Sequence, residues 1–194
     1  MKLYEFAEII TGYGFRSAIE PEVDGPVSVF QAKDLVRDEP FTDINKLTKI
    51  SQSFLGYEGY LKKNDILIVS RGMKAGAFRA TTFASDATNV MASASVHVMR
   101  VRSSKLSTIL PEYVSHYLNS NEGQTELAEM VTGSYIGALP RRELEKIDIP
   151  IVPIQEQQML IDLYRNIRQQ QKFLDRKREL VQKIVDAAFS TLTK

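Results

Sequence analysis

Arginines and lysines beside glycines are the residues whose types and spacing best suit chemistry in this chain, namely binding to phosphates and base edges. The whole chain has a formal net charge of only +1, but between residues 62 and 105 eight bases stand against Asp65 and Asp86. The bases are Lys62, Lys63, Arg71, Lys74, Arg79, Arg100, Arg102 and Lys105. Such clustering favours contact with a nucleic-acid backbone, and a merely solvated basic face is the alternative interpretation.

Three glycine-containing segments are candidate recognition loops. Arg71 and Lys74 follow an apolar run, and arginine is the residue best suited to guanine O6 and N7. Lys62, Lys63 and Arg79 are better interpreted as phosphate contacts. The second candidate is Ser134 and Tyr135, between two glycines and close to Arg141 and Arg142, and the third is Arg16 after Gly12-Tyr13-Gly14. For each segment a solvated loop is the alternative.

The sequence lacks the common motifs for catalysis. There is no glycine-rich phosphate loop before Lys-Ser/Thr, no Gly-x-Ser-x-Gly elbow and no methyltransferase motif. The two histidines, His97 and His116, are isolated, and the chain has no cysteine. We therefore expect no catalytic residue, no metal site and no cofactor.

The N-terminal 153 residues predict an α+β domain with a mixed sheet and flanking helices. Residues 2–10 have apolar positions at helical spacing, and 27–31, 66–70, 77–83 and 96–101 resemble strands, with 66–70 central because it is almost wholly apolar. Residues 111–118, which begin with a proline, and 124–130 predict helices. Residues 34–50 are expected to form a loop with a short helical piece.

Residues 154–194 predict one long helix with a coiled-coil pattern. Apolar residues recur every seven positions at a, with further ones at d and on one flank. The residues expected at a partner interface are Leu160, Leu163, Ile167, Phe173, Leu174, Leu180, Val181 and Ile184. A domain of this size cannot cover the whole helix, which favours an intermolecular coiled coil. The alternative is a helix folded back onto its own domain. An acidic N-terminus unlike a signal peptide and the lack of a membrane-length apolar run favour the cytoplasm.

Four segments together resemble the specificity subunits of type I restriction–modification systems. The first is Leu3 to Arg16, a helix followed by a glycine turn and an arginine. The second, 64–72, is similar to the family's Gly-Asp-Ile-Leu-x-x-x-Arg-x-Gly pattern, with Asn64 in the glycine position. The third is 133–142, a turn before an apolar run. The fourth and most specific, 144–157, is close to Leu-x-x-Ile-x-Ile-Pro-x-Pro-x-x-Glu-Gln.

The resemblance implies a DNA-binding target recognition domain at 1–153 and a spacer helix at 154–194. Such subunits read the halves of a split double-stranded DNA sequence, dock adenine methyltransferase subunits and work beside a translocating nuclease subunit in restricting complexes. Full-length members hold two recognition domains and two helices, whereas this chain has one of each. A half-length subunit could regain the two-fold arrangement as a homodimer through antiparallel helices, and pairing with another half-subunit is the alternative. A protein that only assembles through its helix and reads no DNA is the alternative.

Overall fold

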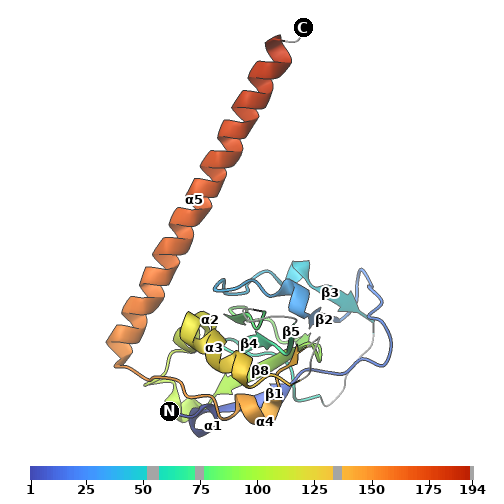
Figure 1. Ribbon diagram of the computed structural model, residues 1–194. Coiled ribbons are helices and arrows are strands. Elements are labelled where there is room, and N and C mark those ends of the chain that lie inside the picture. Colours follow the sequence, from blue (N-terminus) through green and yellow to red (C-terminus); the bar gives the residue numbers. More distant parts are fainter. Residues whose placement is uncertain (52–56, 73–76, 133–136, 193–194) are drawn as a thin grey trace.

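The computed structural model describes residues 1–51, 57–72, 77–132 and 137–192, which form an α+β globular part and one long projecting helix (Figure 1). The central sheet has four antiparallel strands in the order β1 (Ala7–Thr11), β8 (Val96–Val101), β4 (Ile66–Val69) and β6 (Ala80–Thr82). β4 is wholly buried between β8 and β6, which confirms the central place that its apolar sequence predicts.

The predicted helix over residues 2–10 is wrong beyond its first turn. Helix α1 spans only Leu3–Phe6, and β1 then pairs with β8 along its whole length, with Ile9 opposite Met99. Within β1, Ala7 and Ile9 are buried and Glu8 is exposed, which is the two-residue alternation of a strand. Only four apolar residues supported the helical spacing. Pairing with β8 outweighed it and made residues 7–11 a strand.

A smaller sheet packs over one face of the central sheet. Its order is β3 (Thr48–Ile50), β2 (Val27–Phe30) and β7 (Val90–Ala92); β2 runs antiparallel to β3 and parallel to β7. Phe30, Leu67, Phe83 and Val98 belong to the apolar core shared by the two sheets. The predicted strand at 27–31 is confirmed, whereas β3 and β7 were not predicted. Short 3₁₀ turns stand at η1 (Ala32–Asp34) and η2 (Ile44–Lys46).

Helices cover the other face of the central sheet. α2 (Pro111–Asn119), with its proline in the first turn, and α3 (Asn121–Glu129) confirm two predicted helices. α1, the short α4 (Arg141–Leu144) and the 3₁₀ turn η3 (Ser103–Lys105) complete the chain on this side. Apolar side chains of α1, α2, α3 and α4 form the largest core with the inner face of the sheet.

Helix α5 (Ile154–Leu192) leaves the globular part and extends well beyond it (Figure 1). Its start is fixed by Gln157, whose side chain is fully buried. The Gln157 amide accepts from the Leu110 N–H at 2.9 Å and donates to the carbonyls of Thr108 and Val152 at 2.9 and 2.7 Å. The side chain thereby satisfies backbone groups beside the first turns of both α2 and α5, which ties the two helices together.

Candidate nucleic-acid interface

A two-stranded ladder joins residues that flank two of the three candidate recognition loops. β5 (Arg71–Gly72) pairs antiparallel with β9 (Gly137–Ala138), with Arg71 opposite Ala138. Beside this ladder the Leu139 N–H donates to the Ser70 carbonyl at 2.9 Å. Segments 73–76 and 133–136 therefore both continue from one ladder, although they are distant in sequence. Lys74, Ser134 and Tyr135 lie outside the described residues.

Close packing requires glycine in both strands at one end of this ladder, where Gly72 pairs with Gly137. A Cβ atom on Gly72 would overlap the Cβ of Ala77, and one on Gly137 would overlap the Val131 side chain and lie 3.2 Å from the Gly72 carbonyl oxygen. The glycines thus let the two backbones approach each other at the point where the candidate loops begin.

Arg71 and Arg79 lie at the same end of the central sheet, here named the Arg71 end, and Arg16 follows β1 five residues after its last residue, Thr11. Strand register places Arg71, Arg79 and the end of β1 there, because Thr11 pairs with His97, His97 with Ile68 and Ile68 with Ala80. The side chains of Arg16 and Arg71 are exposed. Arg79 is half-buried and donates from Nη2 to the Ala32 carbonyl at 3.1 Å, so part of its donor capacity is used within the fold.

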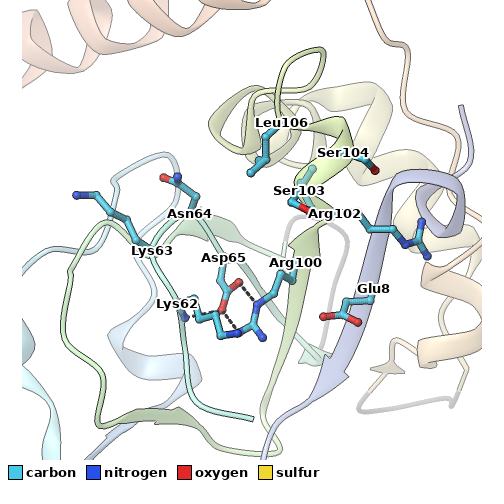
Figure 2. A pocket seen from close by; sticks show the side chains of 11 residues that line it. Glu8, Lys62, Lys63, Asn64, Asp65, Arg100, Arg102, Ser103, Ser104 and Leu106 are labelled. Carbon is cyan, nitrogen blue, oxygen red and sulfur yellow. Dashed lines mark hydrogen bonds and ion pairs between the residues drawn. The ribbon is translucent and has the colours of Figure 1, made fainter. Parts of the chain in front are cut away.

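Lys62 and Lys63 lie at the opposite end of β4, here named the Lys62 end. Both are exposed and line a pocket of about 560 Å³ together with Arg100 and Arg102 (Figure 2). Lys63 Nζ contacts the Asp86 carboxylate at 3.0 Å. The basic stretch that looks continuous in sequence is therefore divided between the two ends of one strand.

The Lys62 end is organised by a buried ion pair that the sequence analysis missed. Asp65, 1% exposed, accepts two hydrogen bonds from Arg100, at 2.8 and 2.7 Å, and one from the Lys62 N–H at 2.8 Å (Figure 2). The hydrogen bonds to Asp65 raise the pKa of Arg100. Arg100 also donates to the Tyr60 carbonyl at 2.9 Å. The aspartate of the Gly-Asp-Ile-Leu pattern was the available signal for this pair.

Asn64, in the glycine position of that pattern, has a φ of 72°. This left-handed conformation favours glycine and tolerates asparagine, so the local backbone accounts for both residues at this position.

Arg141 and Arg142 are exposed on α4, next to β9. Arg141 Nε contacts Glu145 Oε1 at 2.9 Å along the helix. Nearby, buried His97 is hydrogen-bonded through Nε2 to the Leu139 carbonyl at 2.8 Å. Burial lowers the pKa of His97, and the positive charge of Arg141 acts in the same direction, which fits a neutral structural histidine.

Helix α5 uses one face for its own globular part and presents the opposite face to solvent. Ile161 is buried against the globular part, the Tyr164 ring stacks on His116 at 4.3 Å, and Arg165 contacts Glu112 at 2.6 Å. These residues occupy heptad positions b, e and f, opposite the a, d and g face. The exposed side chains on that other face, 39–69% accessible, are Leu160, Leu163, Ile167, Phe173, Leu174, Leu180, Val181 and Ile184.

The described ranges hold no cluster of three or more His, Asp or Glu side chains placed to hold a metal ion. In the same ranges, no helix is both long enough and apolar enough to cross a membrane.

Comparison with known proteins identifies one family. The family model described as the type I restriction modification DNA specificity domain matches residues 1–177. One similar solved structure comes from work on the complex assembly and conformational transition of the type I R-M system. It has a TM-score of 0.59 and 19% sequence identity, over 90% of this chain and 39% of that one. The HsdS subunit from Thermoanaerobacter tengcongensis has a TM-score of 0.57 and 20% sequence identity, over 91% of this chain and 38% of that one.

The S subunit of a type I restriction–modification system from M. genitalium gives a TM-score of 0.54 and 13% identity, over 84% of this chain and 37% of that one. This chain thus spans about two fifths of the length of the structures it matches. A search of curated proteins gave no match.

Proposed function

This chain belongs to the type I restriction–modification DNA specificity family, and from that premise we propose that it reads one half of a split double-stranded DNA sequence. Residues 1–153 form the reading domain in this proposal, and residues 154–194 form the spacer and partner helix. The chain itself catalyses no reaction; methylation belongs to adenine methyltransferase subunits and cleavage to a translocating nuclease subunit where one is present.

The β5–β9 ladder is the observation that carries the reading role. It gives two glycine-bounded loops a common origin at the Arg71 end of the sheet, where exposed Arg71 and Arg141 lie on neighbouring segments. Two loops from one rigid ladder can enter a groove together, and arginine can then bind guanine O6 and N7 through two hydrogen bonds. In the proposal Arg71, Lys74, Ser134 and Tyr135 contact base edges.

Phosphate contacts position the domain in this proposal and carry no sequence information. They are assigned to Lys62, Lys63 and Arg79, to Arg141 and Arg142 beside the reading loops, and to Arg16. Lys62 and Lys63 lie at the other end of β4 from Arg71, so the DNA backbone would extend along the sheet from one end to the other.

The open face of α5 supports the assembly part of the proposal. Exposed apolar side chains on the face opposite the globular part need a partner, and a second copy in antiparallel orientation supplies the same seam. Two identical reading domains would then face the two halves of a palindromic split site. The adenine methyltransferase subunits dock on the paired helices.

The experiment compares two double charge reversals at opposite ends of β4, each in the complex with an adenine methyltransferase subunit. Arg71→Glu with Lys74→Glu should weaken binding and also relax base preference in the target, by about 1–3 kcal/mol at the affected position. Lys62→Glu with Lys63→Glu, the matched control in charge, should weaken binding to every sequence alike and flatten its dependence on salt. Binding is measured by titration over a range of salt concentrations with randomised half-sites.

Unchanged target preference and unchanged methylation in the Arg71/Lys74 variant would remove this loop from the reading site. Binding that is insensitive to both reversals would contradict DNA recognition altogether and favour a protein that only assembles through its helix.

A further inference from the structure

The join between α5 and the globular part is built mainly from charged side chains. After Ile161 and Tyr164, α5 is joined to the globular part by Arg165, Arg168 and Lys172. Arg165 contacts Glu112 of α2 through two hydrogen bonds, at 3.0 and 2.6 Å. Arg168 and Lys172 both contact Glu39, at 2.9 and 2.7 Å, from successive turns of α5. The join therefore has an apolar base and an ionic upper part.

Glu39 is held in place by its neighbour Asp38. Asp38 has a φ of 56°, a conformation that costs a non-glycine residue energy and persists only where the surroundings enforce it. Here its carboxylate accepts from His116 Nδ1 at 2.7 Å and from Asn119 Nδ2 at 2.8 Å. Asn119 in turn is hydrogen-bonded to both backbone groups of Ala80 in β6. The segment before β3 is thus fastened to α2 and the sheet, with Glu39 directed at α5.

His116 joins the two parts of this network. It is buried, its ring lies parallel to the Tyr164 ring of α5, and its Nε2 lies 3.7 Å from Glu112 Oε1. The hydrogen bond from Lys172 lowers the pKa of Glu39. Burial raises the pKa of Glu112, but the interactions with His116 and Arg165 outweigh it, so the net shift is downward. Both carboxyl groups are therefore ionised at neutral pH and can hold the three bases of α5.

Because α5 is long, a small displacement at the join moves the far end of the helix by a larger distance. Gln157 fixes the base of the helix, and Lys172 is its last contact with Glu39, about 22 Å further along at 1.5 Å per residue. Another 20 residues, about 30 Å, extend beyond Lys172. A shift of about 3 Å at Lys172 would therefore move the far end by about 7 Å, which is about two base-pair steps of DNA.

We propose that Glu39, Glu112 and His116 are positioning residues that fix the direction of α5 relative to the globular part. This inference rests on the proposed function, since it assigns the network the task of setting the distance between the two half-sites. The apolar base attaches α5 to the globular part, and the ionic part determines the direction of the helix.

Distance measurements between two spin labels test the inference without DNA or a methyltransferase. The chain has no cysteine, so Thr125→Cys on α3 and Gln182→Cys on α5 give two single, exposed attachment points. The labelled chain is diluted into unlabelled chain, which removes distances between copies. We expect Glu39→Gln with Glu112→Gln to broaden the distance distribution and to shift its mean by about 5 Å or more. Molar salt should broaden that of the unsubstituted protein by screening the exposed pairs.

Glu179→Gln is the matched control. Glu179 also contacts two bases, Arg176 and Lys183, at 2.8 and 2.7 Å, but both lie within α5 itself. Its loss should leave the distance distribution unchanged. Glu39→Gln alone, at a side chain 40% exposed, is the variant to use if the double variant fails to fold. An unchanged distribution in a folded Glu39 variant would overturn the inference.

Methylation of DNA substrates whose half-sites are moved apart by single base pairs gives the functional measurement. The Glu39/Glu112 variant should accept a wider range of spacers, whereas the Glu179 variant should keep the original preference. If the Glu39/Glu112 variant broadens the distance distribution but the original complex recognises no DNA, the role of the join in directing α5 is supported. The proposed function is then contradicted instead. A broadened distribution with unaltered spacer preference would contradict the task of setting the distance between the two half-sites.

Discussion

Asn64 shows at the level of one residue how backbone conformation explains a position in the family pattern. Its φ of 72° places it in the turn that leads into β4, directly before buried Asp65. A β-branched residue is strained in that conformation, so Asn64→Val should lower the free energy of unfolding by about 1–3 kcal/mol. Urea denaturation followed by circular dichroism measures the change.

Asn64→Gly is the control for that substitution, since glycine adopts positive φ without strain and should leave stability within about 0.5 kcal/mol of the original. Equal stability of the valine and glycine variants would mean that the turn relaxes to another conformation and that the positive φ is not required.

The sequence shows which residues are basic, but it did not predict which of them lie close together in the fold. Lys62 and Arg71 are nine positions apart, and a strand between them places their side chains at opposite ends of the sheet. In contrast, Arg71 and Ala138 are far apart in sequence and adjacent in β5–β9. Asp65 and Arg100 form their buried pair across neighbouring strands in the same way. Proximity of this kind depends on strand pairing, which a local charge count does not contain.

At the level of elements, the join of α2 and α5 should respond to pH through His116. Burial lowers the pKa of His116, but the hydrogen bond to Asp38 and the negative charge of Glu112, 3.7 Å from Nε2, outweigh it, so the net shift is upward. Asp38 and Glu112 face the ring with negative charge, and Tyr164 of α5 covers one side of it while Arg165 neutralises part of Glu112. The protonated ring therefore stabilises the folded chain below the unfolded-state pKa of about 6.5, and this contribution is lost as pH rises through the folded-state pKa.

The measurement compares the original chain with His116→Gln by urea denaturation between pH 6 and pH 9. The stability difference in favour of histidine should shrink as pH rises. His97, whose pKa burial lowers, titrates in both proteins and cancels in the comparison. A difference that grows with pH would show that the neutral ring is the form that stabilises the join.

Elements that carry a long regular pattern were predicted, and several short ones, β3 and β7 among them, were not. The seven-residue repeat over residues 154–194 predicted α5, and the apolar run at 66–70 predicted the central strand β4. β3 and β7 have only three residues each, too few for any period to emerge, and they exist because β2 pairs with both. β1 was mistaken for helix because its burial is set by pairing with β8.

At the level of the whole molecule, α5 separates two tasks on its two faces. The b, e and f face holds the globular part by Ile161 and by the charged join, which reaches Lys172. The a, d and g face stays open from Leu160 to Ile184, alongside the globular part and beyond it. A partner helix can therefore lie along α5 without displacing the globular part, and the two reading domains would stay on the outer sides of the pair.

Lysines in this open seam test whether it is an interface. Leu174→Lys with Val181→Lys would place two charges in the middle of the apolar stripe, where burying an unpaired charge costs several kcal/mol. We expect the particle mass measured by light scattering to fall to that of one chain, and methylation by the reconstituted complex to fall with it. Gln169→Lys with Gln182→Lys adds the same charge at positions c and b, outside the seam, and should leave the mass unchanged. If the seam variant keeps the mass of the original particle, Leu174 and Val181 do not lie between copies, and the antiparallel arrangement of the two reading domains loses its physical basis.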